Sequence, residues 1–259
     1  MSVVTKHEIA KMIDHSLLHP TMDDVTLREG IYLAEKYNVA SVCIKPNAVK
    51  MAADLLRDSD VMVGTVIGFP HGSSKVEVKE FETENAIEDG AVEIDMVVNS
   101  GKVLSGDWEY IDAEIGAVAA VTKKRGAALK VIFENDFLPE DSYKIKLCEI
   151  CSKHKVEFVK TSTGYGFVKQ SDGSYNYKGA TVHDLKLMRQ HADPEVQVKA
   201  AGGVRTLEDT LKVRELGVTR IGATATKRFF WQSGVGMLPN DEQVENRSFA
   251  CQFYHTSNY

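Results

Sequence analysis

The chain has 259 residues, 43% of them hydrophobic and 26% charged, and its formal net charge at pH 7 is -6. Acidic and basic residues are interspersed and form no clustered basic face, which argues against a nucleic-acid-binding protein. No apolar segment is long enough to span a membrane, and the N-terminus lacks the apolar core of a signal peptide. We therefore expect a cytoplasmic protein without a membrane or nucleic-acid partner.

Eight short segments, apolar or alternating in pattern, predict β-strands. In chain order they cover residues 13–18, 39–44, 61–67, 92–98, 128–133, 156–161, 196–200 and 218–222. Four of these segments follow shortly after a residue typical of helix C-caps, namely Asn38, Gly90, Gly126 and Gly217. Each of these residues is expected to end one helix and lead into the next strand.

Amphipathic stretches between these segments predict helices, the clearest from Trp108 to Val118 and another beginning with a capping box at Thr206 and Asp209. Strands that alternate with helices pair in parallel through crossover connections. Eight such units favour an α/β fold, a single (β/α)8 TIM barrel over residues 1–259, with a short N-terminal helix and a polar tail from about residue 237. The alternative, an open doubly wound sheet, would carry a glycine-rich phosphate loop after its first strand, and none is present.

Charged residues interrupt four of the predicted strands, where barrel packing requires apolar side chains. They are Asp95, Lys130, Lys160 and Lys199. Side chains alternate between the two faces of a strand, so the valine before each of the last two lysines faces the helices and the lysine faces the barrel axis. Both lysines also lie near the C-terminal ends of their strands, where barrel enzymes assemble their active sites.

Two lysines in a partly dry pocket suit nucleophilic chemistry on a carbonyl group. An amine must be uncharged to attack a carbonyl carbon, and both burial and a neighbouring cation disfavour its protonation. A nearby carboxylate such as Asp95 then moves protons during dehydration and enamine formation. These groups are the minimum set for a Schiff-base aldol reaction.

A purely structural arrangement of the same charges is the alternative interpretation. Asp95 with Lys130, and Asp14 with Lys160, would then form salt bridges that only fill the barrel. Such ion pairs also perturb pKa values, so one charged residue alone does not distinguish the two interpretations.

The four cysteines show no paired metal-ligand spacing, and we expect no metal site. Cys148 and Cys151 suit one face of an amphipathic helix, where their sulfur atoms would pack against the core. Cys43 falls in a predicted strand and is expected to border the site or to pack beside it.

Several segments resemble, in the same order, the motifs of deoxyribose-phosphate aldolases. The two lysine motifs are FVKTSTG at residues 158–164 and VKAAGGVRT at residues 198–206. They are supported by IDHSLL at 13–18, VCIKP at 42–46, GFPHG at 68–72 and VEIDMV at 92–97. The resemblance extends from about residue 13 to about residue 225.

This resemblance implies reversible cleavage of 2-deoxyribose 5-phosphate to acetaldehyde and glyceraldehyde 3-phosphate on a (β/α)8 barrel, without a metal or organic cofactor. Lys160 corresponds to the lysine that forms the Schiff base, and Lys199 corresponds to the second lysine, which lowers the pKa of the first and helps to transfer protons. Asp95 corresponds to the acid/base aspartate, and Lys130 to a polar residue that orients it. The last residue, Tyr259, is similar to a C-terminal tyrosine that assists proton transfer in some members.

For the substrate's phosphate group, the resemblance implies binding by backbone amides at Gly164, Gly202 and Gly203 and by the hydroxyl of Thr224. Glycine permits such a close approach, and the second and third glycines lead into a capped helix whose N-terminus favours an anion. Two further candidates for substrate contact are Asp14 and Cys43.

Some residues depart from the family pattern. Tyr165 replaces a lysine and Ala225 a second serine that some members have, and the polar loop at residues 165–179 is longer than in compact members. A Schiff-base aldolase for another phosphosugar or for unphosphorylated aldehydes is therefore one alternative function. A non-catalytic phosphosugar-binding barrel is another. The resemblance implies a monomer or a homodimer.

Overall fold

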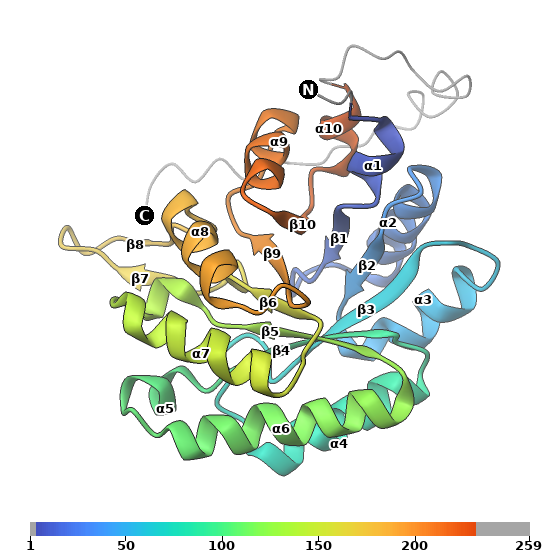
Figure 1. Ribbon diagram of the computed structural model, residues 1–259. Helices are drawn as coiled ribbons and strands as arrows, with labels where there is room; N and C mark the ends of the chain where they lie inside the picture. The colour runs from blue at the N-terminus through green and yellow to red at the C-terminus, as the bar shows by residue number, and fades with distance from the viewer. Residues whose placement is uncertain (1–3, 232–259) are drawn as a thin grey trace.

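The computed structural model describes residues 4–231, in which eight parallel strands close into a barrel (Figure 1). Around the barrel they follow the order β1-β10-β9-β6-β5-β4-β3-β2. The strands are β1 (Ile13–Leu17), β2 (Ser41–Ile44), β3 (Met62–Ile67), β4 (Glu93–Val97), β5 (Ala128–Ile132), β6 (Phe158–Lys160), β9 (Gln197–Ala201) and β10 (Val218–Ala223). Because β1 pairs with both β10 and β2, the open sheet is excluded and the predicted (β/α)8 barrel is confirmed.

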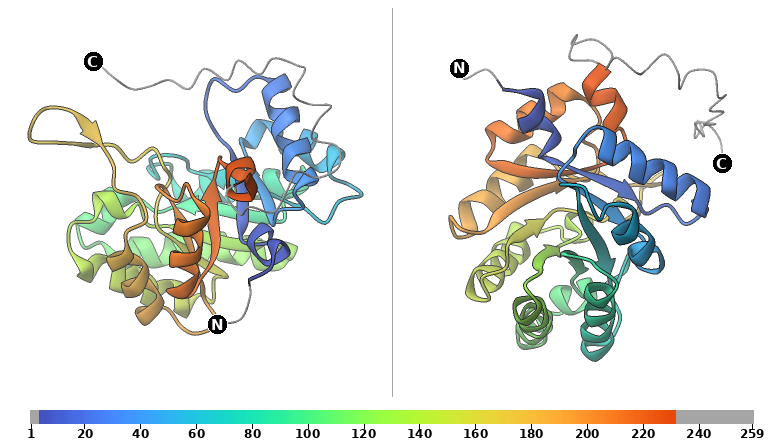
Figure 2. Two further views of the ribbon diagram at one scale, coloured as in Figure 1. Left: turned by 90° about the horizontal axis from the view of Figure 1, so that it is seen from above. Right: turned by 90° about the vertical axis from the view of Figure 1, so that its right-hand side faces the viewer.

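Helices cover the outside of the strands in every view (Figures 1 and 2). They are α1 (Lys6–Ala10), α2 (Asp24–Lys36), α3 (Val49–Leu55), α4 (Val76–Glu88), α5 (Ser100–Leu104), α6 (Trp108–Arg125), α7 (Asp141–Lys153), α8 (Val182–His191), α9 (Leu207–Glu215) and α10 (Thr226–Trp231), with short 3-10 helices η1 (Pro46–Ala48) and η2 (Asn135–Phe137). The first of them confirms the expected short N-terminal helix. The predicted polar tail from residue 237 lies outside the described residues.

Helix faces and helix ends follow the patterns expected from the sequence. Helix α6 buries Ile111 and Val118, and its C-cap Gly126 adopts the left-handed conformation with φ 72°. Helix α9 begins with the predicted capping box, in which Thr206 and Asp209 each accept a hydrogen bond from the other's backbone amide. Positive φ angles are also found at the other three predicted helix ends, Asn38, Gly90 and Gly217.

The cysteines of α7 pack against the core, as the sequence analysis expected. Cys148 and Cys151 are both free and fully buried. Burial raises the pKa of Cys148 to about 12, so its thiol stays protonated and unreactive at neutral pH.

A buried ion pair outside the barrel joins α4 to α6. Lys79 Nζ lies 2.6 Å from Glu114 Oε1, and both side chains are 0% exposed. The same ammonium donates hydrogen bonds to the carbonyl oxygens of Gly72 at 2.8 Å and Val97 at 2.7 Å. The pair therefore ties two helices to the loop that follows β3 and to the C-terminal end of β4.

The long loop that follows β6 contains an antiparallel hairpin, where the sequence predicted only a polar loop. Strands β7 (Val168–Lys169) and β8 (Tyr175–Asn176) project away from the barrel (Figures 1 and 2). At its base the rings of Phe167 and Tyr177 meet edge to face, with their centroids 5.2 Å apart.

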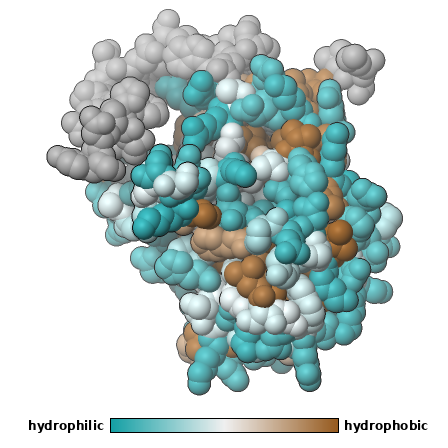
Figure 3. Space-filling view, turned by 90° about the vertical axis from the view of Figure 1, so that its left-hand side faces the viewer, coloured by the Kyte–Doolittle hydropathy of each residue, from teal (hydrophilic) through white to brown (hydrophobic). Residues whose placement is uncertain are grey.

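The molecular surface seen from the side of this hairpin is mostly hydrophilic, with small hydrophobic patches scattered over it (Figure 3). Among residues 4–231, no helix combines the length and the apolar character needed to cross a membrane.

Candidate active site

Strand register brings the four predicted charged side chains together inside the barrel. Lys160 on β6 pairs in register with Lys199 on β9, and Asp95 on β4 pairs with Lys130 on β5. Residues that are register partners project to the same face of a sheet. All four side chains are buried, with exposed fractions of 3% or less. The charges therefore converge on the barrel axis, as the strand pattern predicted.

One carboxylate oxygen joins the two lysines nearest the C-terminal end of the barrel. Asp95 Oδ2 lies 2.7 Å from Lys160 Nζ and 2.7 Å from Lys199 Nζ. The two amines are therefore separated by at most twice that distance. The other oxygen, Asp95 Oδ1, is buried and accepts no hydrogen bond from the described residues, although Lys130 Nζ lies 3.6 Å away. It has a free lone pair with which to accept a proton from a substrate hydroxyl or a water.

A second group of charges lies beside these residues in the barrel. Asp14 forms ion pairs with Lys130 at 2.8 Å, Lys199 at 2.5 Å and Arg220 at 2.8 Å. Glu93 lies 2.6 Å from both Lys130 Nζ and an Arg220 guanidinium nitrogen. Both oxygens of Asp14 are thus occupied, which favours an electrostatic role for this candidate over direct contact with substrate.

Glu93 and Arg220 were not among the predicted site residues, although the same signal marks them. Glu93 stands two residues before Asp95 and so shares its face of β4, and Arg220 interrupts the apolar pattern of β10. The suggested structural pair of Asp14 with Lys160 is wrong, because Lys160 pairs with Asp95 instead. The suggested pair of Asp95 with Lys130 is present, at 3.6 Å.

The number of charges in this network explains why one amine can be neutral. Three carboxylates and four basic side chains take part, namely Asp14, Glu93, Asp95, Lys130, Lys160, Lys199 and Arg220. If all seven were ionised, the barrel interior would hold one uncompensated positive charge, which is costly in a buried site. Loss of one proton from a lysine removes that charge.

The surroundings of Lys160 single it out as the amine that loses its proton. Burial lowers the pKa of Lys160, and the neighbouring ammonium of Lys199 acts in the same direction against the attraction of Asp95. Lys199 behaves differently: burial opposes its charge, but Asp14 and Asp95 outweigh burial and raise its pKa. The pair therefore consists of one amine with a lowered pKa and one with a raised pKa.

Two carboxylates of the network, those of Asp14 and Asp95, stay ionised. Burial alone would raise the pKa of Asp95, but the three nearby lysines hold it well below its usual value. Burial likewise disfavours the charge of Asp14, and Lys130, Lys199 and Arg220 overcome this and keep its pKa low. Asp95 consequently enters a reaction as a proton acceptor.

An apolar wall borders the lysines at the C-terminal end of the barrel. Leu18, Cys43 and Val66 are buried there, and the half-buried side chains of Phe69 and Tyr165 pack against them. Cys43 Sγ lies 3.9 Å from Asp95 Oδ2, and burial together with that carboxylate raises the thiol's pKa to about 11. Cys43 thus borders the site as a neutral thiol.

The glycine candidates lie in turns just beyond the ends of β6 and β9. Gly164, Gly202 and Gly203 have φ angles of 85°, 83° and 88°, a conformation that favours glycine. The last two precede Thr206, the N-cap of α9. Thr224 follows the end of β10 and is exposed. All four residues therefore follow barrel strands at the end where Lys160 lies, whereas Tyr259 lies outside the described residues.

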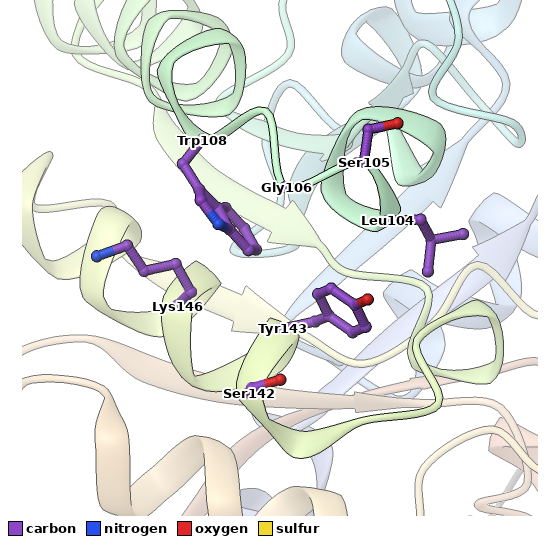
Figure 4. A pocket seen from close by; sticks show the side chains of 7 residues that line it. All are labelled: Leu104, Ser105, Gly106, Trp108, Ser142, Tyr143 and Lys146. Atoms are coloured by element: carbon purple, nitrogen blue, oxygen red, sulfur yellow. The ribbon is translucent and has the colours of Figure 1, made fainter.

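A hollow of about 450 Å³ lies elsewhere, on the outside of the barrel (Figure 4). It is lined by Leu104, Ser105, Gly106, Trp108, Ser142, Tyr143 and Lys146. Its one charged side chain, Lys146, forms an exposed ion pair with Glu149 at 2.8 Å. The hollow shares no residue with the lysine network.

Comparison with known proteins agrees with this geometry. A family model described as DeoC/LacD family aldolase matches residues 8–238. The chain belongs to the DeoC/LacD aldolase family. The deoxyribose-phosphate aldolase of Rhodopirellula baltica is 52% identical over 220 residues, which cover 85% of this chain and 87% of that relative. The enzyme of the same name from Thermococcus kodakarensis is 43% identical over 224 residues, covering 86% and 95% of the two chains.

Solved structures show the same relationship. The deoxyribose phosphate aldolase of Aeropyrum pernix, described as a tetramer, superimposes with a TM-score of 0.78 at 27% identity, covering 88% of this chain and 92% of that one. An aldolase called QR15 gives a TM-score of 0.78 at 31% identity, covering 87% and 95%. Family membership extends over the whole barrel, including every strand that contributes to the lysine network.

Proposed function

We propose that the chain is a deoxyribose-phosphate aldolase that reversibly cleaves 2-deoxyribose 5-phosphate to acetaldehyde and glyceraldehyde 3-phosphate. The observation that carries the proposal is the lysine pair held on one oxygen of Asp95, in which Lys160 has a lowered pKa and Lys199 stays charged. The names of the relatives support the same reaction. Asp95, Lys160 and Lys199 all lie on barrel strands, which hold them rigidly.

In the first step the free amine of Lys160 attacks the aldehyde carbon of the open-chain sugar. The resulting carbinolamine loses water, which requires a proton on its hydroxyl group, and an iminium forms. Lys199, the ammonium held on the same oxygen of Asp95 as Lys160, supplies this proton directly or through a water. The iminium then withdraws electrons from the neighbouring carbon–carbon bond.

The second step breaks the bond between carbons 2 and 3 of the sugar. A base removes the proton of the hydroxyl group on carbon 3, carbonyl formation at carbon 3 releases glyceraldehyde 3-phosphate, and the bonding electrons move into an enamine on Lys160. Asp95 suits the role of base because Oδ1 is free to accept a hydrogen bond. Protonation of the enamine at carbon 2 and hydrolysis of the iminium then release acetaldehyde and restore the amine.

The phosphate group would bind at the glycine turns. Backbone amides of Gly164, Gly202 and Gly203, together with the N-terminus of α9 and the hydroxyl of Thr224, offer hydrogen-bond donors to an anion. Tyr165, in place of a lysine, stacks edge to face on Phe69 with ring centroids 5.5 Å apart and brings no positive charge. Phosphate binding would therefore depend chiefly on backbone groups.

Initial rates with 2-deoxyribose 5-phosphate and with phosphate-free 2-deoxyribose test this proposal. Release of acetaldehyde is followed with an NADH-linked alcohol dehydrogenase. We expect turnover of both compounds and a clear preference for the phosphorylated one. Equal rates would favour the alternative, a Schiff-base aldolase for unphosphorylated aldehydes. Absence of turnover with either compound would contradict deoxyribose-phosphate aldolase activity.

We also propose that the chain is a monomer or a homodimer and that Tyr259 reaches the active site. Sedimentation velocity at several protein concentrations tests the first statement, and a tetramer would contradict it. Deletion of Tyr259 tests the second: proton exchange at the acetaldehyde methyl group should slow in deuterated water. An unchanged exchange rate would remove the tail from the mechanism.

A further inference from the structure

The turn that follows β5 carries two acidic residues that the proposed mechanism does not use. Glu134 is buried and has left-handed backbone angles, φ 55° and ψ 65°, which are uncommon for a residue other than glycine. Asp136 lies two residues later, in η2. The amide of Asn135, between them, donates to the carbonyl oxygen of Thr161 at 2.9 Å. The turn is thus attached directly to the segment that follows Lys160.

Glu134 binds the first glycine turn. Its carboxylate accepts hydrogen bonds from the hydroxyl and, at 3.2 Å, from the backbone amide of Thr163. The hydroxyl of Thr163 in turn accepts a hydrogen bond from the amide of Tyr165 at 2.9 Å. Gly166 passes so close that a Cβ there would lie 2.4 Å from the carboxyl carbon of Glu134. The backbone on both sides of Gly164 is therefore held by this one side chain.

Asp136 binds the far end of the same loop. Its two carboxylate oxygens accept hydrogen bonds from the amides of Lys178 at 2.6 Å and Gly179 at 2.9 Å. Gly179 packs directly on the second glycine turn, because a Cβ there would lie 2.6 Å from the carbonyl oxygen of Gly202. The same carbonyl oxygen accepts a hydrogen bond from the amide of Ala180 at 3.0 Å. Asp136 thus holds the segment against which Gly202 is packed.

We propose that Glu134 and Asp136 are positioning residues for the phosphate end of the substrate site. One acid fixes the turn at Gly164, and the other, through Gly179, fixes the turn at Gly202 and Gly203. The inference rests on the proposed function, because it assigns a purpose to the turns that would receive the phosphate. It extends that function by naming the residues that set phosphate specificity without touching the phosphate.

Two acids beside an anion site would repel the anion unless their charges were compensated. The carboxylate of Asp136 is directed at two backbone amides, which offset its charge locally. Burial raises the pKa of Glu134, and the hydrogen bonds from the amide and hydroxyl of Thr163 offset the charge of its carboxylate locally. Both acids can therefore support the glycine turns without excluding a phosphate.

Replacement of Asp136 by alanine tests the inference, and Asp172→Ala is the matched control. Asp172 lies at the exposed tip of the same loop and also accepts two hydrogen bonds, from the amide and hydroxyl of Ser174 at 2.9 and 2.7 Å, but it contacts neither glycine turn. Kinetic constants are measured for both variants with 2-deoxyribose 5-phosphate and with phosphate-free 2-deoxyribose. The melting temperature of each variant reports whether the barrel is intact.

We expect Asp136→Ala to raise KM for 2-deoxyribose 5-phosphate about tenfold, equivalent to about 1.4 kcal/mol, while kcat changes little. For the phosphate-free sugar kcat/KM should stay within about twofold of the unmodified protein. The inhibition constant of inorganic phosphate, used as a competitive inhibitor, should rise by the same factor. The control Asp172→Ala should leave all these values unchanged.

Other outcomes would contradict the inference in distinct ways. An equal loss with both sugars in Asp136→Ala would make the residue structural, and unchanged constants would remove it from the site. The same KM increase in Asp172→Ala would mean that general loosening of the loop explains the effect. The unmodified protein is assayed first, so absence of turnover there would contradict the proposed function separately from the positioning role.

Discussion

Replacement of Lys199 by methionine should make Lys160 harder to deprotonate. Both amines lie 2.7 Å from the same oxygen of Asp95, which limits their separation to twice that distance. Two like charges about 5 Å apart repel by about 3 kcal/mol at an effective dielectric constant of about 20. Because about 1.4 kcal/mol corresponds to a factor of ten, removal of this repulsion shifts the protonation equilibrium of Lys160 by about 100-fold. Asp95, left with one ammonium fewer, acts in the same direction.

The assay is the rate at which cyanoborohydride traps acetaldehyde on the protein, measured as a function of pH. At neutral pH the Lys199→Met variant should be trapped up to about 100-fold more slowly, and its rate should recover at alkaline pH where Lys160 loses its proton. Lys199→Arg, which keeps the positive charge, is the control and should retain the parent profile. A Lys199→Met variant with the pH profile of the unmodified protein would refute the electrostatic reasoning.

Two further predictions concern stability. The buried ring of His15 has its pKa lowered from 6.5 to about 4, so the unfolded state takes up the proton first. The contribution of His15 to the free energy of unfolding should be fully present above pH 6.5 and fall by about 3 kcal/mol as the pH drops towards 4. Urea unfolding at both pH values measures this loss, which the His15→Gln variant should lack. An equal loss in the variant would exclude His15 as its source. Lys79→Met strands the buried carboxylate of Glu114 and should cost about 3–5 kcal/mol, whereas adding Glu114→Leu should recover most of it. Thermal unfolding of the Lys79→Met variant and of the double variant measures these two effects. A double variant that is no more stable than Lys79→Met alone would contradict the ion-pair account.

The fold was predictable because its signals are local. Each strand is a short and largely apolar segment, and helix ends such as Gly126 and Asn38 carry residues suited to positive φ. The β7–β8 hairpin was not predicted, because its strands have two residues each and alternate too briefly to give a periodic signal. Its position depends instead on tertiary contacts, including the hydrogen bonds from Lys178 and Gly179 to Asp136.

The catalytic candidates were predictable because a charge inside a barrel strand is conspicuous. Their partners were predicted only in part: the Asp95–Lys130 pair is present, but strand spacing gives the face of a side chain and not its reach. Arg220 extends to Asp14 and Glu93, and Lys160 turns to Asp95 rather than to Asp14. Glu134 lies beyond its strand in a turn, where no periodicity applies and only the folded chain brings it to Thr163.

Reduction with borohydride in the presence of acetaldehyde tests the central claim most directly, because it converts a lysine Schiff base into a stable ethyl-lysine. We expect a mass increase of one ethyl group, located by peptide mapping on Lys160. The Lys160→Leu variant should remain folded and unmodified, because Asp95 keeps its ion pairs with Lys199 and Lys130 and is not left as an unpaired buried charge. Labelling on Lys199 instead, or no labelling of the unmodified protein, would contradict the assignment of Lys160 as the nucleophile.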